Sequence, residues 1–501
     1  QNSGVDFFIT NNYRQNLYSP FSEFMILNLQ VLSQSDQFAN LVQWFSLMIS
    51  MLVISVICNE FGLNKKMQLL SAFFIITLPT SILEASTTQN DIVLSAFILI
   101  FYFYQLRIID SPSKSNLIFS GFSLGLGILT KGSSYIFFFP VGFTCFIYMM
   151  LNSETKTKLI IFGRSLMIVS IGFLLNIPHY VRSYTRYNDF LGMDLNHGVV
   201  NEVFSFFTIY SNFFRHIAYQ LGSNFQIINW YIYRFVQILL GDSLNDPKTS
   251  FLGLDFRPPF FSITEDHAGN VIHTFLIITL CVISIMLFKK MSKKQLISMW
   301  IPFLAIVLYC LLLKWQPYTN KMLPLFIIIS PFIIIIINNI IKFERLKTII
   351  YIVFCFIFLL SVPYLFYSKA RPILPLDSES ILNKNRFEIY FSKRPELFNQ
   401  YNDIVKKIYS ISKEDLFFDS IAIHIGGDSW EYPFWVMLNE KFRDRLPYIY
   451  HFKKEHVDSK LYNYEKPNYI IFENIYLKNF AEVKHSYEKV LITEDFSLLK
   501  K

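Results

Sequence analysis

The chain has 501 residues, of which 53% are hydrophobic, 18% aromatic and only 16% charged. Soluble globular proteins are about one quarter charged, so this composition argues against a soluble protein and indicates one embedded in a membrane. The net charge of +8 comes from basic residues in short segments between apolar runs, which is typical of membrane-protein loops and argues against a nucleic-acid-binding patch.

The chain begins with a polar segment. Residues 1–37 are predicted to be an outer loop with a short juxtamembrane helix over residues 22–32, where apolar residues recur at helical spacing. The sequence does not begin with Met and carries no signal-peptide pattern, so we expect that it was processed or is a fragment.

Ten apolar runs follow and predict transmembrane helices, because a spanning helix needs about 20 mostly apolar residues. Six of them lie within residues 38–177 and four within residues 271–368. Their approximate limits are 38–58, 67–86, 91–109, 116–130, 133–151, 159–177, 271–288, 296–313, 322–342 and 347–367. The predicted fold class is therefore a polytopic α-helical membrane protein.

The loops between these runs alternate in charge. Basic residues occupy every second loop, at residues 65–66, 107–114, 156–158, 289–294 and 342–347. The positive-inside rule makes these loops cytoplasmic, which predicts a multi-pass protein of the plasma (inner) membrane. Residue 1 then lies outside the cell, so we expect one more span upstream of it.

Residues 178–270 form a long outer loop in this topology. Within it, residues 203–217 and 224–240 are rich in Phe, Tyr and Ile, and they predict amphipathic helices that lie at the membrane interface. The alternative is that both helices pack against the spans as ordinary structure.

Residues 369–501 differ in character from the rest. Charge rises, and short β-rich runs appear at residues 421–425, 448–451 and 469–472, around a predicted helix at 430–439. This pattern predicts a small α/β domain on the extracytoplasmic side. The five cysteines all lie upstream, in or beside apolar runs and without metal-ligand spacing, so no disulfide framework is expected.

Ionisable residues at membrane depth are costly and therefore indicate function. Asp91 opens the third run, directly after two threonines, Gln89 and Asn90. Asp91 is either a helix-capping acid or part of a cavity that binds a sugar, which the Asn90 amide also suits. Glu84 either lines the same cavity or reaches the interface. Lys131, at the end of the fourth run, either binds phosphate or extends to the membrane surface.

Two carboxylates and two imidazoles lie close together just before the seventh run. Glu265 and Asp266 are candidates for acid/base chemistry, and Asp266 with His273 could hold a divalent metal. The alternative is a solvated cap for the next helix. We expect no other cofactor.

The outer loop at residues 314–321 has a lysine at each end of an aromatic stretch. Lys321 is a candidate phosphate ligand, and Arg14 adds a cation on the same predicted face. Anchoring to lipid headgroups is the alternative. One face of the membrane thus gathers carboxylates, cations and aromatic rings, a set that suits an anionic, lipid-linked substrate with a polar group.

At these residues the chain resembles bacterial membrane glycosyltransferases of the protein O-mannosyltransferase and lipid A aminoarabinose transferase type, within the C-type glycosyltransferase superfamily. The resemblance covers most of the membrane part. It is carried by residues 18–23 (Tyr-Ser-Pro-Phe-Ser-Glu), 84–91 (Glu-Ala-Ser-Thr-Thr-Gln-Asn-Asp), 125–132 (Gly-Leu-Gly-Ile-Leu-Thr-Lys-Gly), 265–270 (Glu-Asp-His-Ala-Gly-Asn) with His273, and 314–317 (Lys-Trp-Gln-Pro) with Lys321.

The resemblance implies transfer of a sugar, with inversion, from a polyprenyl-phosphate carrier to a glycan, lipid or protein acceptor at the outer face. It also implies that the general base is an acid of the first outer loop, which we expect upstream of residue 1. Asp91 would match the second acid of the family site. Lys321 would match the cation that handles the lipid phosphate, and Glu23 the short-helix acid near the donor pocket.

Three other functions are alternatives on the sequence. A lipid or glycan transporter would be expected to show internal repeats, and none is apparent. A polysaccharide polymerase or ligase would share the outer-face cations. A catalytically incomplete fragment, without the first-loop acid, is the third alternative.

Overall fold

The computed structural model describes residues 12, 14–191, 198–340, 342, 344–375, 379–414, 420–427, 429–442, 447–452, 467–477 and 486–501. The chain divides into two compact units. The first, Ser19–Ser368, is here called the membrane unit. The second combines Gln1–Tyr18 with Lys369–Lys501 and is called the terminal unit. Each unit has its own buried apolar core.

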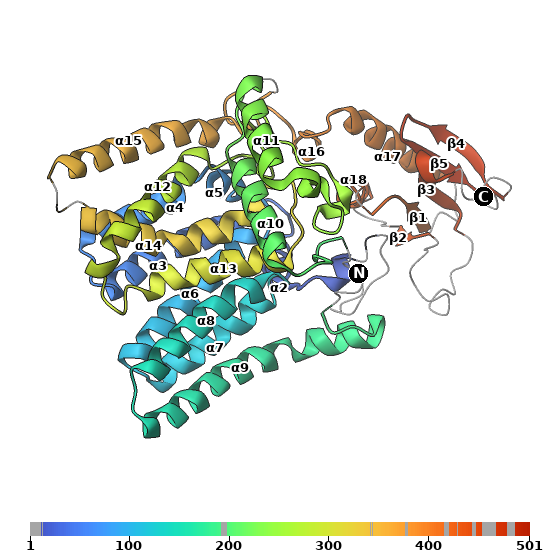
Figure 1. The fold of residues 1–501 in the computed structure, drawn as a ribbon. Coiled ribbons are helices and arrows are strands. Elements are labelled where there is room, and N and C mark those ends of the chain that lie inside the picture. Colours follow the sequence, from blue (N-terminus) through green and yellow to red (C-terminus); the bar gives the residue numbers. More distant parts are fainter. Residues whose placement is uncertain are drawn as a thin grey trace. The chain divides into compact units, whose positions relative to one another are not determined.

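The membrane unit is built from helices (Figure 1). In chain order they are α2 (Phe21–Ser33), α3 (Leu41–Glu60), α4 (Lys65–Ile76), α5 (Pro79–Glu84), α6 (Asp91–Asp110), α7 (Lys114–Ile128), α8 (Ser134–Leu151), α9 (Thr155–Tyr187), α10 (Phe206–Gln220), α11 (Gln226–Leu240), α12 (Val271–Leu287), α13 (Ile297–Leu312), α14 (Leu323–Ile340) and α15 (Glu344–Phe366). Short 3-10 turns are η2 (Gly241–Asn245), η3 (Phe251–Gly253), η4 (Phe288–Lys290) and η5 (Asn320–Met322).

Within the described residues, eight helical segments are long and apolar enough to cross a membrane. They are Leu41–Glu60, Asp91–Asp110, Ser134–Leu151, Thr155–Tyr187, Val271–Lys290, Gln295–Leu312, Asn320–Ile340 and Leu346–Phe366. They coincide with eight of the ten predicted runs, and the polytopic helical fold is confirmed.

The remaining two predicted runs are helical but shorter. Residues 67–86 are divided between α4 and α5, which are separated at Thr77 and Leu78. Pro79 starts α5 because a proline has no N–H to continue α4 and suits the first turn of a new helix. Residues 116–130 form most of α7, which has only 15 residues. The figure of ten spans stays a prediction.

Small residues bring α7 and α9 together. A Cβ atom on Gly125 would lie 2.6 Å from Leu175 Cδ1 and 3.1 Å from the Cα of Gly172. The side-chain amide of Asn176 donates to the carbonyl oxygens of Gly125 (2.9 Å) and Gly172 (2.8 Å). Close backbone approach at small residues is a usual way for membrane helices to pack.

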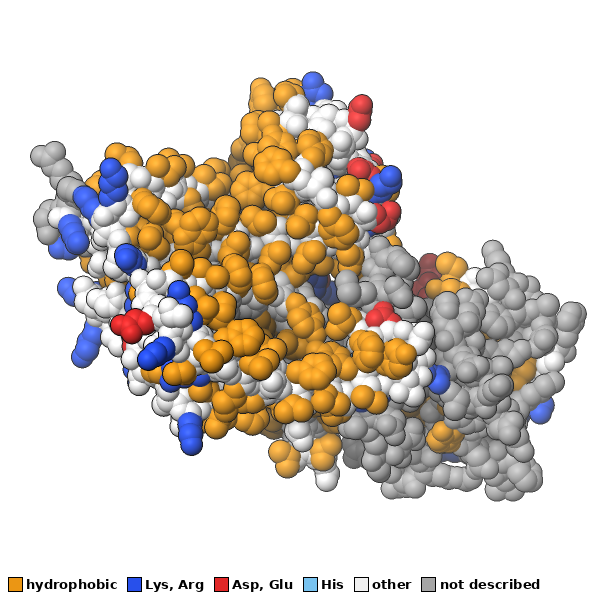
Figure 2. All heavy atoms as spheres, turned by 60° about the horizontal axis from the view of Figure 1, so that its bottom comes forward, with side chains coloured by type: hydrophobic (Ala, Val, Ile, Leu, Met, Phe, Trp, Pro, Cys, Tyr) orange, Lys and Arg blue, Asp and Glu red, His pale blue; other side chains and the backbone are white. Residues whose placement is uncertain are grey.

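The predicted cytoplasmic loops meet at one end of the membrane unit. Lys294, after η4, pairs with Asp110 at the end of α6, and Arg107 pairs with Glu60 at the end of α3. Figure 2 shows apolar side chains over most of this face and basic side chains gathered at one end. This is the charge distribution that the positive-inside rule describes.

The outer helices α10 and α11 differ in their surroundings. Arg215 of α10 is fully buried and donates to Ser250 Oγ (2.7 Å) and to the carbonyl oxygen of Thr249 (3.1 Å). Asn212 donates to the carbonyl oxygen of Cys310 (2.8 Å), which fixes α10 on α13. Helix α11 instead exposes apolar side chains such as Trp230. Helix α10 therefore packs against its neighbours, whereas α11 has an exposed apolar face, and a position of α11 at the membrane interface stays a prediction.

The terminal unit is a small α/β domain, as predicted. Its helices are α1 (Arg14–Leu17), α16 (Arg386–Tyr390), α17 (Glu396–Glu414), α18 (Tyr432–Lys441) and α19 (Asn474–Leu477), and its strands are β1 (Ser420–His424), β2 (Tyr448–His451), β3 (Tyr469–Glu473), β4 (Glu488–Ile492) and β5 (Phe496–Lys500). The strand order is β2-β1-β3-β5-β4, with β1 parallel to β2 and β3, and β5 antiparallel to β3 and β4.

The turn after β1 is held by one acid. Glu473 Oε2 accepts the backbone N–H of Gly426 (2.7 Å) and the hydroxyl of Ser429 (2.6 Å). Asn12 donates its side-chain amide to the carbonyl oxygen of Gly427 (2.8 Å), which ties Asn12 to this turn. The glycine-containing segment therefore connects β1 to α18.

Candidate active site

A buried ion cluster lies among the starts of three helices in the membrane unit. Asp91 has a side chain that is 2% exposed, with Oδ1 2.5 Å from Lys131 Nζ and Oδ2 3.8 Å from Lys321 Nζ. The side chains of Lys131 and Lys321 are 19% and 35% exposed. The two lysine side chains are therefore partly exposed, whereas the carboxylate that they contact is buried.

The backbone explains why these residues meet. Asp91 is the first residue of α6, where the helix dipole favours a carboxylate. Lys131 lies in the turn before α8, and Lys321 lies in η5, directly before α14. Three helix N-termini, each with a partial positive charge, thus start at the cluster. The lysines and the helix ends together favour an anion.

Glu84 belongs to the same cluster. It is the last residue of α5 and is fully buried. Asp91, Lys131 and Lys321 all act on its carboxyl group electrostatically. Asn320 lies beside Glu84, yet neither carboxyl oxygen accepts a well-directed hydrogen bond from the described residues. Glu84 is therefore enclosed and does not reach the interface, and its place in a substrate cavity stays a prediction.

An amide network borders the charges. Asn320 donates to Gln89 Oε1 (2.7 Å), and Gln89 donates to Asp266 Oδ1 (2.9 Å). The backbone carbonyl of Asp266 accepts the N–H of Thr319 (2.8 Å). Three separate motifs of the sequence therefore form one layer, in which the Asp266 carboxylate is an acceptor for amides.

The network continues away from the charges. Gln220 at the end of α10 donates to the carbonyl of Thr319 (3.1 Å) and accepts the backbone N–H of Asn270 (3.0 Å). Asn270 Oδ1 accepts the hydroxyl of Thr80 on α5 (3.0 Å). These bonds fix the loops before α12 and α14 against α5 and α10, and so hold Lys321 in place.

Aromatic groups form a further edge of this layer. The Tyr219 hydroxyl donates to the carbonyl of Pro317 (2.8 Å) and lies 3.3 Å from His267 Nδ1. The rings of His267 and Tyr318 are 5.7 Å apart and inclined by 33°. Burial raises the pKa of Tyr219 to about 12, so its hydroxyl keeps its proton at neutral pH. The His267 and Tyr318 rings are both partly exposed. His267 directly follows Asp266 in the chain, and Tyr318 directly precedes Thr319.

Two other predicted residues border the cluster. Asn90 donates its side-chain amide to the carbonyl of Thr130 (3.3 Å), which joins the start of α6 to the residue before Lys131. Glu23, in the first turn of α2, feels the charge of Lys131. Loss of water around its carboxyl group raises the pKa of Glu23, and its own backbone hydrogen bond and Lys131 oppose that rise.

Two candidates remain, Glu265 and Arg14. Glu265 is buried next to Asp266 in the chain. Arg14 belongs to the terminal unit, where its Nε donates to Asn12 Oδ1 (3.0 Å). The roles predicted for Glu265 in acid/base chemistry and for Arg14 in donor binding stay predictions.

The proposed metal ligands Asp266 and His273 bind different partners. Asp266 accepts the Gln89 amide, whereas His273 Nε2 lies 3.1 Å from the Thr77 hydroxyl and its ring meets the edge of Phe74. Among the described residues, no group of three or more His, Cys, Asp and Glu side chains is placed to hold a metal ion. Asp266 and His273 thus have separate partners, and a divalent metal held by them stays a prediction.

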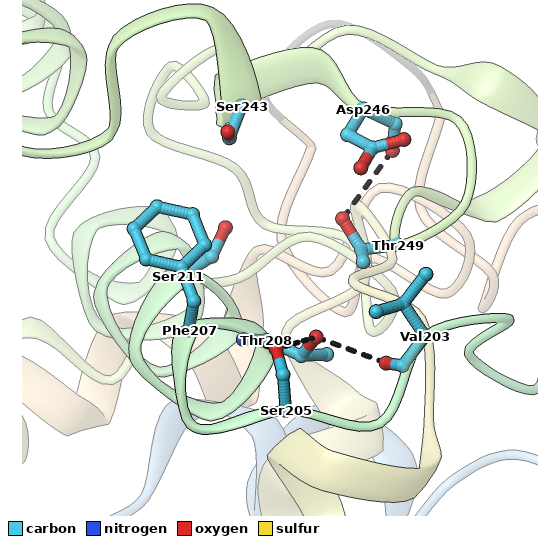
Figure 3. Close-up of a pocket in the computed structure, with 8 residues that line it drawn as sticks. All are labelled: Val203, Ser205, Phe207, Thr208, Ser211, Ser243, Asp246 and Thr249. Carbon is cyan, nitrogen blue, oxygen red and sulfur yellow. Dashed lines mark hydrogen bonds between the residues drawn. The ribbon is translucent and has the colours of Figure 1, made fainter.

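A small pocket lies between α10, with the residues just before it, and residues 243–249 (Figure 3). Its volume is about 70 Å³, and it is lined mainly by hydroxyl groups, including Ser205, Thr208 and Thr249. Thr208 donates to the carbonyl of Val203 (2.9 Å). A space of this size holds a few water molecules and is too small for a sugar ring.

Sequence reasoning missed the residues that build the site without carrying charge. Asn320, Gln220 and Thr80 gave no signal, because amides and hydroxyls near helix ends usually cap those ends. Arg215 was visible as a charge within an apolar stretch. Its burial depends on Thr249 and Ser250, which only the fold brings near it.

The comparisons with known proteins agree with the fold. Residues 19–181 match the family described as dolichyl-phosphate-mannose-protein mannosyltransferase. The crystal structure of ArnT from Cupriavidus metallidurans bound to undecaprenyl phosphate matches with a TM-score of 0.51 and 10% identity, over 97% of this chain and 88% of that one. Its apo structure matches with a TM-score of 0.52 and 10% identity, over 96% and 87%.

No curated protein sequence matched the chain. The family match covers most of the first half of the membrane unit, and the ArnT match covers nearly the whole chain. The resemblance stated on the sequence motifs is therefore confirmed. This chain is a multi-pass membrane protein with the fold of ArnT, and its residues 19–181 carry the sequence pattern of the dolichyl-phosphate-mannose-protein mannosyltransferase family.

Proposed function

We propose that this protein is a glycosyltransferase that moves a sugar, with inversion, from a polyprenyl-phosphate donor to an acceptor hydroxyl at the outer face of the plasma membrane. The observation that carries the proposal is the pair of accessible lysines, Lys131 and Lys321, held over the buried Asp91. The acceptor is a glycan, a lipid or a protein. The terminal unit is extracytoplasmic in this proposal.

The cluster suits the phosphate of such a donor. Two ammonium groups and the starts of α6, α8 and α14 offer positive charge to one anion. ArnT, which shares the fold, was crystallised with undecaprenyl phosphate. A lipid carrier also fits a site within a bundle of spanning helices, because the prenyl chain can remain in the bilayer.

The reaction needs little proton chemistry at the leaving group. The bond between the sugar C1 and the donor phosphate oxygen breaks as the acceptor oxygen bonds to C1. The phosphate leaves as a stable anion, so electrostatic stabilisation by Lys131 and Lys321 replaces a general acid. The acceptor proton passes to a base. Asp91, beneath both lysines, acts as a positioning residue for them.

The amide network beside the lysines fits the sugar. Gln89, Asn320 and Asp266 offer amide and carboxylate groups of the kind that bind hydroxyls. The partly exposed rings of His267 and Tyr318 offer apolar faces for the C–H groups of a pyranose ring.

The test is sugar transfer by the complete protein, in lipid, with radiolabelled polyprenyl-phosphate sugars. Asp91→Asn removes the charge that holds both lysines, and we expect transfer to fall by about 100-fold or more, in the range seen when a preorganised electrostatic group is lost. Glu202→Gln is the matched control, because this half-exposed acid pairs with a different lysine, Lys314. Transfer that is absent from the parent protein with every such donor would overturn the proposal.

A further inference from the structure

Glu84 is an ionisable residue of the cluster, and the proposed reaction gives it no role. It is 0% exposed and ends a six-residue helix, α5, whose proline start fixes its direction. Neither of its carboxyl oxygens accepts a well-directed hydrogen bond from the described residues. Asp91, by contrast, is paired with Lys131 at 2.5 Å.

The charged neighbours of Glu84 come from three elements. Asp91 faces it from α6, Lys131 from the turn before α8, and Lys321 from η5. Helix α15 packs on α5 through Tyr364, which contacts the neighbouring Leu83. Asp91 already uses both lysines, so a second carboxylate at this place would be buried beside a like charge and without hydrogen bonds.

We propose that the Glu84 carboxyl group holds a proton, so that the cluster carries one net positive charge and selects a phosphate with a single negative charge. The inference rests on the proposed function. Two ammonium groups and the one Asp91 carboxylate leave this single positive charge within the cluster. The Asp266 carboxylate, which also acts on Lys321, accepts the amides of Gln89 and Asn320 and is counted with that bordering network. The sugar donor is a phosphodiester with one negative charge, whereas the spent carrier is a phosphate monoester with nearly two at neutral pH. The cluster thus neutralises the donor fully, whereas the second charge of the product would have no partner in a partly desolvated site, which favours release of the product.

The first experiment detects the proton directly. Infrared difference spectra between neutral and alkaline pH are recorded for the complete protein in nanodiscs, and compared with Glu84→Gln and Glu202→Gln. We expect a carboxylic-acid C=O band that disappears at alkaline pH in the parent and in Glu202→Gln. Glu84→Gln should lack that band. A parent spectrum identical to that of Glu84→Gln overturns the inference.

The second experiment measures the consequence for ligands. Undecaprenyl phosphate and its methyl phosphodiester are titrated into the parent and Glu84→Gln. Because glutamine imitates the protonated acid, the variant should bind the diester within about threefold of the parent at neutral pH, less than the tenfold that a removed like charge at this range can give. At alkaline pH the parent should lose diester affinity more than the variant. Diester binding tenfold tighter in the variant at neutral pH overturns the inference.

The two proposals fail in different ways. If neither protein binds either polyprenyl ligand, the proposed donor class is wrong, and the infrared band still decides whether Glu84 is protonated. If both ligands bind with the same pH dependence in parent and variant, the donor class stands and the role of Glu84 is wrong.

Discussion

Asp91 holds two lysines that are not equivalent. Lys131 lies 2.5 Å from its carboxylate and has a side chain that is 19% exposed, whereas Lys321 lies 3.8 Å away and is 35% exposed. Lys131 therefore has the character of a structural ion-pair partner. Lys321 is the cation with more freedom to contact a ligand.

We expect Lys321→Met mainly to weaken binding of the donor. Loss of one charge-assisted contact to phosphate should raise the KM for a polyprenyl-phosphate sugar by about tenfold to 100-fold, equivalent to about 1.5–3 kcal/mol. The measurement is transfer kinetics together with thermal unfolding in detergent. An unchanged KM would show that Lys321 does not touch the donor.

Lys131→Met should lower the stability of the fold in addition to weakening donor binding. It leaves Asp91 buried without its close partner, and breaking a buried ion pair costs about 3–5 kcal/mol. We expect a clearly lower unfolding midpoint than for Lys321→Met. Equal midpoints for the two variants would contradict this division of roles.

The burial of Arg215 predicts that its substitution will lower the stability of the protein. Its guanidinium group binds Asn212, Thr249 and Ser250, and burial lowers its pKa only to about 10, so it stays charged at neutral pH. Lysine cannot reproduce the planar fork of donors. Arg215→Lys should therefore destabilise the protein by about 2 kcal/mol or more, as expected when buried acceptors lose charged donors.

Arg234→Lys is the matched control for that variant. Arg234 lies on the neighbouring helix α11, exposed, with one hydrogen bond to Gln237 (2.7 Å). Its unfolding midpoint should remain near that of the parent. If both arginine variants unfold at the same temperature, the hydrogen bonds of the buried Arg215 do not stabilise the fold around α10.

At the scale of helices, α7 and α9 can approach closely only because Gly125 has no side chain. Gly125→Val would place a branched side chain 2.6 Å from Leu175 and against the backbone of Gly172. We expect α7 to separate from α9, with loss of folded protein in a detergent stability assay. Overpacking of this kind costs about 1–3 kcal/mol or more, because neither backbone can withdraw.

Gly163→Ala provides the comparison on α9 itself. A Cβ atom there meets nothing within 4 Å, so the substitution should leave stability unchanged or raise it by about 0.5–1 kcal/mol. A loss of stability equal to that of Gly125→Val would indicate a general intolerance of α9 and not a close contact.

Helix breaks show the limit of composition at this scale. Apolar runs predicted α3, α6 and α14 nearly to their ends, since uninterrupted apolar segments of that length have few other structures in a membrane. The run at residues 67–86 looked equally continuous. Pro79 divides it, and the division orients α5 so that Glu84 meets Asp91.

For the whole molecule, the alternation of basic loops predicts the topology. Alkaline phosphatase needs the disulfide-forming extracytoplasmic space to fold, so its fusions report orientation. In a bacterial host we expect fusions after Asn188 and after Lys501 to be active and a fusion after Lys293 to be inactive. Activity after Lys293 would reverse the orientation that the basic loops imply.

The sequence alone determined the class of this protein and the parts of its site. Apolar runs, basic loops and a charged C-terminal region follow from local composition, because each helix must satisfy its own backbone in lipid. The motifs around Asp91, Asp266 and Lys321 were visible for the same reason, as polar residues where polar residues are costly. Only the tertiary structure decided how they combine. It paired Asp91 with two lysines, gave Asp266 to an amide network, separated His273 from it and enclosed Glu84. Those outcomes depend on contacts between residues up to 231 positions apart in the chain, and no local pattern encodes such pairings.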